Sequence, residues 1–490
     1  MKRTLVLLIA ALLVLAVGAS LYAAGQREAT APEGQPLVWY VPGGNGYPYD
    51  EAEEQMVYDA FNAMLERDLG ITVDVNVQGS FSEYNERMPL ILASGEYMDV
   101  MWTANWSNDF VKNAYDGFYA GLDDLLENYG QDILADTREQ LEATRINGEI
   151  RGVWSQQVAA LNSIIRVRTD LAEKYGWDMD SVRHIRDIEP FLADVRDNEP
   201  ELVPFAMPNW GSVTPFYKMA GVGAGPMGVR VDEYPIKVIN FLETPEYREW
   251  VELVWDWQNK GFIPEDGVTY TRDQWNQIVN QGRNAFGQHN TYNPQLAERD
   301  LGGYWVKKYR IGEPMVLTHN IINTLMAVHS RSTRKEDSVR MLNWLWTNSE
   351  GYNTIVWGLE DRHFERLGPN QIRPIQDSGY WGNIPWMWGN TFIGYLLPGQ
   401  REDLFEQVAI FNREAAPANI LGFVADTHAV RTLMASVSAV VDQFEDPLQG
   451  GWVDPATGIA EFQTALDRAG FQDLMAAMQA QIDEWVASNE

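Results

Sequence analysis

The chain opens with a pattern that is typical of an open α/β sheet. Leu37 to Val41 is a short apolar run, and the segment Pro42 to Gly46, with three glycines, ends it. The stretch from Glu51 to Leu69 has apolar residues at helical spacing and stops before Gly70. Apolar and polar residues then alternate from Ile71 to Val77, which is the period of a half-buried strand. Strand, glycine loop, helix and strand in this order predict the first unit of an α/β domain.

The rest of the chain continues to mix strand-like and helix-like stretches, without an internal repeat. Further strands are predicted near 99–102, 150–154 and 162–167, and helices near 246–260 and 332–346. Apolar residues at helical spacing over 462–486 predict one long final helix.

The N-terminus predicts export. Lys2 and Arg3 precede an unbroken apolar run from Leu5 to Val17, and small residues follow up to Ala24. This run is too short to span a membrane and is typical of a secretory signal peptide, so we assign residues 1–24 to a signal peptide. Residues 25–36 are polar with two prolines and are expected to form a disordered leader. The predicted location is therefore periplasmic or extracellular.

The amino-acid composition further limits the classes of function that the chain can have. The chain has no cysteine, so we expect neither disulfides nor a lipid anchor on an N-terminal cysteine. Its net charge of −32 becomes −34 when Lys2 and Arg3 are removed, which disfavours nucleic acid as a partner. The sequence holds 19 Trp, 21 Tyr and 18 Phe. Most aromatic rings fill cores, but an excess of Trp in an exported protein also suits the binding of sugar faces.

The sequence contains no motif for catalysis, a metal or a cofactor. HExxH is absent, and the 6 His are scattered without metal-ligand spacing. The GxGxxG match at Gly223–Gly228 lacks the preceding strand and following helix of a dinucleotide site. We therefore expect a protein that is not an enzyme and that uses no metal and no cofactor.

Several segments, taken in order, resemble the extracellular solute-binding proteins of ABC importers. This is the class that includes maltose-binding protein, and the resemblance is to its LplA-like subfamily. The segments that carry it are 69–76, 90–102, Leu122–Leu126 (LDDLL), 147–154, 168–176, 282–287, 343–346, Tyr352, 357–360 with His363 and Glu365, and 418–424, the last of which resembles the subfamily's C-terminal domain of unknown function. Trp154 stands where the family pattern has Pro, and the usual lipid-attachment Cys is missing.

The resemblance implies an α/β, periplasmic-binding-protein-like type II fold. Two α/β lobes would be joined by a multi-strand hinge, with extra helices at the C-terminus. We place lobe 1 at 37–159 and 284–326, and lobe 2 at 160–283 and 327–490 including the C-terminal helical region. The crossings between lobes are expected near 159–161, 281–285 and 323–328. Proteins of this fold close about their hinge on a ligand, because a ligand that contacts both lobes favours the closed form.

Position in this fold suggests the ligand-binding residues. Glycine lets the main chain approach a ligand closely, and Asn offers both a donor and an acceptor to hydroxyl groups. Loops after lobe 1 strands, the crossings and lobe 2 supply the candidates: Gly43, Gly44, Asn45, Trp102, Asn105, Trp106, Trp154, Gln156, His289, Trp210, Tyr217, Trp381, Trp386 and Trp388. The tryptophans could equally pack in the core.

The function predicted from these features is capture of a carbohydrate, an oligosaccharide by preference, and its delivery to an ABC transporter. The expected partners are the sugar and the permease subunits, with the binding protein as a monomer. Two alternatives stay open. One is a secreted glycoside hydrolase that uses paired carboxylates, although the eight strand–helix repeats of a barrel are missing. The other is a binding protein for a peptide or another polar solute.

Overall fold

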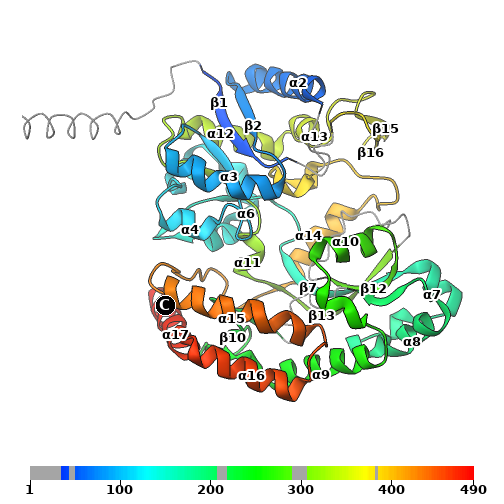
Figure 1. Cartoon of the computed structure of the whole chain (residues 1–490). Coiled ribbons are helices and arrows are strands. Elements are labelled where there is room, and N and C mark those ends of the chain that lie inside the picture. Colours follow the sequence, from blue (N-terminus) through cyan, green and yellow to red (C-terminus); the bar gives the residue numbers. More distant parts are fainter. Residues whose placement is uncertain (1–34, 44–49, 207–217, 290–305, 381–383, 490) are drawn as a thin grey trace, which may run out of the picture.

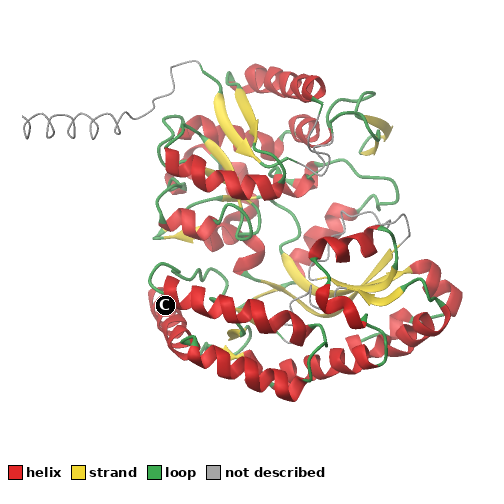
Figure 2. Ribbon diagram, in the orientation of Figure 1, coloured by secondary structure: helices red, strands yellow, loops and turns green. Residues whose placement is uncertain are grey.

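The computed structural model describes residues 35–43, 50–206, 218–289, 306–380 and 384–489. These residues form two lobes, one above the other in Figure 1, and each lobe has a central sheet with helices packed around it (Figure 2). The apolar side chains gather into two main clusters, one for each lobe. Each lobe therefore has its own core, as expected for units that move relative to one another.

Lobe 1 is built on the predicted opening unit. Its described part holds a five-stranded sheet in the order β2-β1-β3-β14-β6, in which β1 pairs in parallel with β2 and β3, and β14 is antiparallel. The strands are β1 (Leu37–Val41), β2 (Val73–Val77), β3 (Val100–Thr103), β6 (Val153–Trp154) and β14 (Leu325–Val328). The helices are α2 (Glu51–Leu69), α3 (Phe81–Ser94), α4 (Phe110–Tyr115), α5 (Asp123–Tyr129), α6 (Gln131–Leu141), α12 (Lys335–Thr347) and α13 (Ser349–Trp357). Two hairpins, β4 (Arg145–Ile146) with β5 (Glu149–Ile150) and β15 (Phe364–Gly368) with β16 (Gln371–Pro374), complete it.

Local sequence explains where the first helices of lobe 1 begin and end. The Asp50 side chain accepts hydrogen bonds from the first turn of α2, and Gly70 ends that helix in the left-handed conformation at φ 70°. Ser80 and Glu83 form a capping box at the start of α3. This cap fixes the position of Phe81, the first residue of α3, which matters for the site described below.

Lobe 2 is built on a second sheet, in the order β17-β13-β7-β12-β8 over the described residues. Its strands are β7 (Ala160–Arg168), β8 (Val203–Ala206), β12 (Asn284–His289), β13 (Val306–Val316) and β17 (Ala416–Pro417). A smaller sheet holds β9 (Met219–Gly221), β10 (Met227–Arg230) and β11 (Ile239–Asn240). The helices are α7 (Thr169–Tyr175), α8 (Glu189–Asn198), α9 (Pro245–Asn259), α10 (Arg272–Asn280), α15 (Arg431–Gln449), α16 (Pro455–Arg468) and α17 (Phe471–Asn489).

The sheet pairing corrects the predicted lobe boundaries. Residues 284–289 and 306–316 supply β12 and β13 of the lobe 2 sheet, whereas 284–326 were assigned to lobe 1. Residues 327–380 and 384–403, which run from within β14 to the start of α14, lie with lobe 1, whereas they were assigned to lobe 2. The expected crossing at 281–285 is a connection within lobe 2. The error arose because the sequence of one strand does not specify which distant strand it pairs with.

Among the described residues, the chain passes between the lobes in three places. The first lies between β6 and β7, the second is α11 (Thr318–Ile321) between β13 and β14, and the third is α14 (Leu404–Glu414). Figure 1 shows α11 and α14 between the two lobes.

The predicted final helix is two helices. Gly470, with φ 86°, separates α16 from α17, so apolar spacing alone hid the break. The Phe462 and Phe471 side chains on either side of the break are both fully buried in the lobe 2 core. Within the described ranges, which start at residue 35, no helix combines the length and apolar character that crossing a bilayer requires.

Candidate ligand-binding site between the lobes

A pocket of about 560 Å³ lies between the two lobes. Four segments line it: the loop after β3 in lobe 1 (105–111), β9 and its continuation in lobe 2 (220–223), the second crossing (317–323), and the start of the C-terminal region (420–434). The pocket thus borders both lobes and one of their connections. Its size is in the range of sites that hold small ligands.

Asparagine side chains form one wall of this pocket. Asn105 comes from lobe 1, and Asn320 and Asn323 come from the second crossing. Asn105 is held in place because its Nδ2 donates to the main-chain oxygen of His319 at 3.1 Å and to His319 Nδ1 at 2.8 Å. Its main-chain nitrogen also donates to the oxygen of Ile322 at 2.9 Å. These bonds join the lobe 1 loop to the crossing.

Among the described residues, the amide oxygens of this wall have no hydrogen-bond partner. The Oδ1 atoms of Asn105, Asn320 and Asn323 are all buried and unpartnered in the structure. In Asn105 the orientation follows from the network, because the group facing the His319 carbonyl must be the donor. Asn320 as a whole is only 3% exposed. A buried acceptor without a donor costs free energy, so this wall is suited to a ligand that brings donors.

Two titratable groups border the pocket, Asp109 and His319. Asp109 is exposed and caps α4 by accepting a hydrogen bond from the Lys112 main-chain nitrogen at 3.0 Å. Desolvation by the surrounding protein lowers the pKa of His319, which favours the neutral ring. In that neutral ring Nδ1 accepts from Asn105, so the proton is on Nε2.

The C-terminal region supplies the apolar wall. Ile420, Phe423 and Val424 line the pocket. Thr318 fastens this segment to the crossing, since its Oγ1 donates to the Ile420 oxygen at 3.2 Å and accepts from the Gly422 nitrogen at 2.9 Å. The same short segment packs on both cores, with Ile420 and Phe423 in lobe 2 and Val424 against lobe 1.

Beside the pocket lies a cluster of four aromatic rings, which we call the aromatic cluster: Phe81, Trp102, Trp106 and Trp386. Their ring centroids are separated by 5.2 to 6.3 Å. Trp386 comes from η8 (Pro385–Met387) and stacks on Phe81. Trp106 is 50% exposed, whereas Trp102 is fully buried. The exposed ring is thus the immediate chain neighbour of Asn105, which lines the pocket.

Hydrogen bonds tie the aromatic cluster to the second crossing. Trp102 Nε1 donates to Thr324 Oγ1 at 3.0 Å, and Trp106 Nε1 donates to the Asn323 main-chain oxygen at 2.8 Å. The Thr324 hydroxyl in turn donates to the Trp386 oxygen at 3.4 Å. The cluster and the asparagine wall are therefore supported by the same residues, 323–324.

The other crossings are joined to each other as well. Asn412 of α14 accepts from the Ala159 nitrogen at 2.8 Å and donates to the Gln157 oxygen at 2.7 Å. At the rim of the pocket, His428 of the C-terminal region lies 3.3 Å from Asp116 of lobe 1, measured from Nε2 to Oδ1. These contacts hold the lobes in one arrangement without a continuous core between them.

The structure distributes the predicted ligand-binding residues unevenly. Asn105 lines the pocket, and Trp102, Trp106 and Trp386 belong to the aromatic cluster. The buried Gly43 donates to the Gly79 oxygen at 2.7 Å, just before α3, and Gln156 lies in the first crossing, where its main-chain oxygen accepts from Thr391. Neither lines the pocket. His289 ends β12, where its main chain pairs with Ile164. Gly44, Asn45, Trp210, Tyr217 and Trp381 lie outside the described residues.

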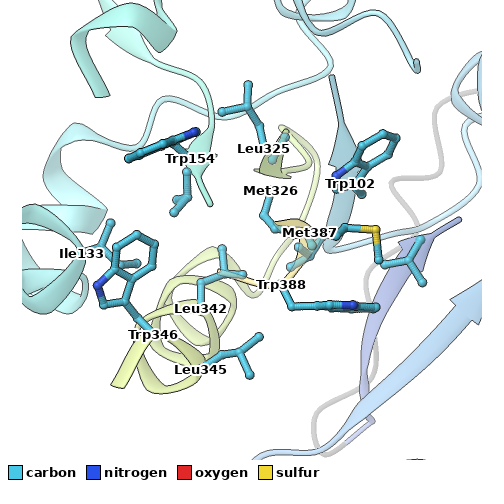
Figure 3. Packing of buried hydrophobic residues seen from close by; sticks show 14 of the residues in the cluster. Trp102, Ile133, Trp154, Leu325, Met326, Leu342, Leu345, Trp346, Met387 and Trp388 are labelled. Carbon is cyan, nitrogen blue, oxygen red and sulfur yellow. The ribbon is translucent and has the colours of Figure 1, made fainter. Parts of the chain in front are cut away.

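Besides the fully buried Trp102, two other predicted residues, Trp154 and Trp388, are core residues. Trp154 is 2% exposed and Trp388 is 4% exposed, and both belong to the lobe 1 core. Figure 3 shows them among apolar side chains of β14 and α12, including Leu325, Met326, Leu342 and Trp346. Trp388 also packs edge-on against Trp39, with ring centroids 5.1 Å apart. Their place in a hinge segment and an aromatic loop suggested ligand contact, but burial rules it out in this arrangement. Trp386 and Trp388 also lie with lobe 1, not lobe 2.

Sequence analysis missed Asn320, Asn323 and the wall formed by the C-terminal segment. The run Thr318–Thr324 (THNIINT) is short, polar and placed between two strands, which is the available signal. In the part of the chain that the structure describes, no group of three or more His, Asp or Glu side chains is arranged to hold a metal ion.

The two lobes, the three crossings and the pocket between them define the type II class of solute-binding proteins. One family model matches the chain: residues 419–487 match a domain of unknown function (DUF3502). A "Carbohydrate ABC transporter substrate-binding protein" of Streptococcus pneumoniae is 26% identical over 447 residues, which cover 88% of this chain and 87% of the relative. The predicted resemblance to extracellular solute-binding proteins of ABC importers is confirmed.

Solved structures agree with this assignment. The N-glycan transport solute binding protein NgtS from Streptococcus pneumoniae is 23% identical, and the two chains superpose with a TM-score of 0.81 over 93% of this chain and 100% of NgtS. NgtS in complex with Man1GlcNAc superposes with a TM-score of 0.74, and in complex with Man5GlcNAc with 0.70. The alginate-binding protein AlgQ2 is 15% identical, with a TM-score of 0.62 over 93% of this chain and 100% of AlgQ2. The predicted fold class is confirmed.

Proposed function

We propose that this protein is a solute-binding protein that captures an oligosaccharide in the pocket between its lobes and delivers it to an ABC transporter. The observation that carries this proposal is the asparagine wall, whose three buried amide oxygens lack donors. Sugar hydroxyl groups can donate hydrogen bonds to these amide oxygens. The carbohydrate-binding relative and the glycan-bound NgtS structures support the same class of ligand.

The arrangement of the lobes supports binding by closure. The pocket borders both lobes, so an occupant would contact both and stabilise their approach. NgtS superposes better in the structure for which no glycan is named than in the two that hold one. The present chain is closer to the arrangement without a named glycan, and closure on a ligand would follow from there.

A hydrolase is less well supported. Glycoside hydrolases use a pair of carboxylates on either side of the scissile bond. Asp109 is the one carboxylate among the described residues that line the pocket. A binding role also fits the relatives, which are binding proteins.

Export and partners follow from the same proposal. The basic and apolar N-terminus would direct secretion, and the mature protein would act as a monomer outside the cytoplasm. Its acidic surface suits a protein that stays dissolved and does not bind anionic membranes. The permease subunits would recognise the closed arrangement, which forms when a ligand is bound.

A binding screen tests the proposal. The mature chain, from residue 25, is titrated with a library of hexose and N-acetylhexosamine oligosaccharides while its melting temperature is recorded. A ligand that binds only the folded state stabilises it by about 2.7 kcal/mol at a hundred times its Kd. We expect saturable stabilisation by at least one oligosaccharide, with no release of reducing ends. Absence of saturable binding across the library, or turnover at an enzyme-like rate, would refute the proposal.

A further inference from the structure

We propose that the pocket selects an uncharged saccharide and rejects an acidic one, because its wall presents unpartnered acceptors and its described lining holds no Lys or Arg to neutralise a carboxylate. This inference rests on the proposed function and specifies its substrate class. It is carried by Asn105, Asn320 and Asn323, whose unpartnered oxygens line one pocket.

The amide oxygens of the asparagine wall favour a ligand that carries hydrogen-bond donors. Each amide oxygen accepts hydrogen bonds and repels other acceptors. Neutral sugars carry many hydroxyl donors, and each donor that meets one of these oxygens removes the cost of an unpaired buried group. A carboxylate has no donor when ionised, so it leaves the oxygens unpaired and adds its own lone pairs beside them.

The charged groups near the pocket also disfavour an acidic ligand. A carboxylate that enters a buried site without a cation to neutralise it keeps most of the cost of losing its hydration. None of the described residues lining the pocket is Lys or Arg. Lys112, close in sequence, bonds to Asp116 at 2.6 Å. Asp109 at the rim would repel an acidic sugar, and the lowered pKa of His319 favours its neutral form.

The C-terminal segment forms an apolar wall of the same pocket. The apolar side chains of Ile420, Phe423 and Val424 line the pocket beside the crossing. Apolar side chains can cover the C–H faces of a neutral sugar ring, but they cannot solvate an anion. Both walls therefore favour the same class of ligand.

The test uses matched pairs of tetrasaccharides that differ only in C6. The pairs are β-1,4-mannotetraose with β-1,4-tetramannuronate, and cellotetraose with its tetrauronate, and N-acetylhexosamine oligosaccharides extend the neutral set. Affinity is measured by calorimetry at about 0.15 M and about 0.5 M NaCl, because salt screens the general repulsion from the acidic surface but much less the contacts inside the pocket.

We expect neutral probes to bind at least about tenfold more tightly than any acidic probe at both salt concentrations. Acidic binding that equals or exceeds neutral binding overturns this inference and leaves the proposed function standing. A preference that vanishes at high salt also overturns it, since the surface charge would then be the cause. Binding of no probe of either kind overturns the proposed function, and this inference with it.

A substitution assigns the effect to the wall. Asn320→Leu removes one unpartnered oxygen and keeps the branched shape of the side chain, so affinity for the tightest neutral probe should fall by about fivefold or more while the melting temperature does not fall. The matched control is Asn62→Leu, because Asn62 on α2 has both amide groups bonded to the main chain of Val73 and lies away from the pocket. It should lower the melting temperature and leave affinity unchanged. Unchanged affinity in Asn320→Leu would refute the role of the wall.

Discussion

The aromatic cluster and the asparagine wall are adjacent, and they differ in how their polar atoms are satisfied. In the cluster, the indole nitrogens of Trp102 and Trp106 both donate to the second crossing. In the wall, the amide oxygens of Asn105, Asn320 and Asn323 accept nothing. Since buried polar groups are normally paired within the protein, the unpaired set marks the surface that a ligand completes. The cluster, by contrast, stabilises the position of the wall.

The rings of the aromatic cluster differ in how far they are exposed to solvent. Trp102 is fully buried and contacts the other three rings, whereas Trp106 is half exposed. Residue type and local sequence do not distinguish the two. Substitution of Trp102 should therefore affect mainly folding stability, whereas substitution of Trp106 should affect mainly ligand binding.

The largest effect should come from Trp102→Ala. It removes a fully buried ring and the bond to Thr324, so the free energy of unfolding should fall by about 3–5 kcal/mol. Urea unfolding, followed by circular dichroism, measures this loss. Trp106→Ala serves as the comparison and should cost less than about 1.5 kcal/mol, because that ring is half exposed. Equal losses of unfolding free energy in the two variants would contradict this difference in burial between Trp102 and Trp106.

A smaller effect is expected on affinity from Trp106→Ala. If the exposed ring covers part of a bound sugar, its removal should weaken binding by about 1–2 kcal/mol, measured by calorimetry with the tightest oligosaccharide of the screen. Tyr234→Ala is the control, since Tyr234 is 77% exposed and does not line the pocket. An unchanged affinity in Trp106→Ala would confine the cluster to a structural role.

Sequence periodicity predicted the local elements well where one face of an element meets a core. The helix at 51–69 and the strands at 37–41 and 73–77 follow directly from apolar spacing and from Gly70. The assignment of 284–326 and 327–490 to lobes failed, because strand partners are chosen by contacts between segments far apart in the chain. β13 pairs with β7, more than a hundred residues earlier, and nothing local to β13 specifies this.

The candidate site was predicted less completely, for a related reason. Trp154 and Trp106 are both tryptophans near a strand end, yet one is 2% and the other 50% exposed. Only the packing of β14 and α12 decides which ring is covered. Asn320 and Asn323 became visible as site residues through their missing partners, and a missing partner is a property of three-dimensional structure alone.

The smallest effect should be a dependence on pH that arises from His319, which connects the wall to the crossing. Desolvation lowers its pKa in the folded protein, so between the unfolded value near 6.5 and the lowered folded value the unfolded chain binds the additional proton. The stability that the neutral ring contributes is present above about pH 6.5, and it declines as the pH falls toward the folded pKa. One proton limits the slope to about 1.4 kcal/mol per pH unit.

Urea unfolding between pH 7.5 and pH 5 isolates this contribution when wild type is compared with His319→Asn. The subtraction is needed because burial lowers the pKa of His329 to about 4 and also lowers that of His363, so both add to the same acid-side loss. The variant should show a shallower decline than wild type below pH 6.5, whereas His329→Asn should remove a different part of the decline without affecting ligand affinity. Because a ligand would desolvate His319 further, affinity in the wild type should stay flat until the pH falls to the lowered pKa of the free folded protein, and it should weaken below that point. Identical pH profiles for wild type and His319→Asn would mean that the asparagine wall is insensitive to the charge of the residue to which Asn105 is bonded.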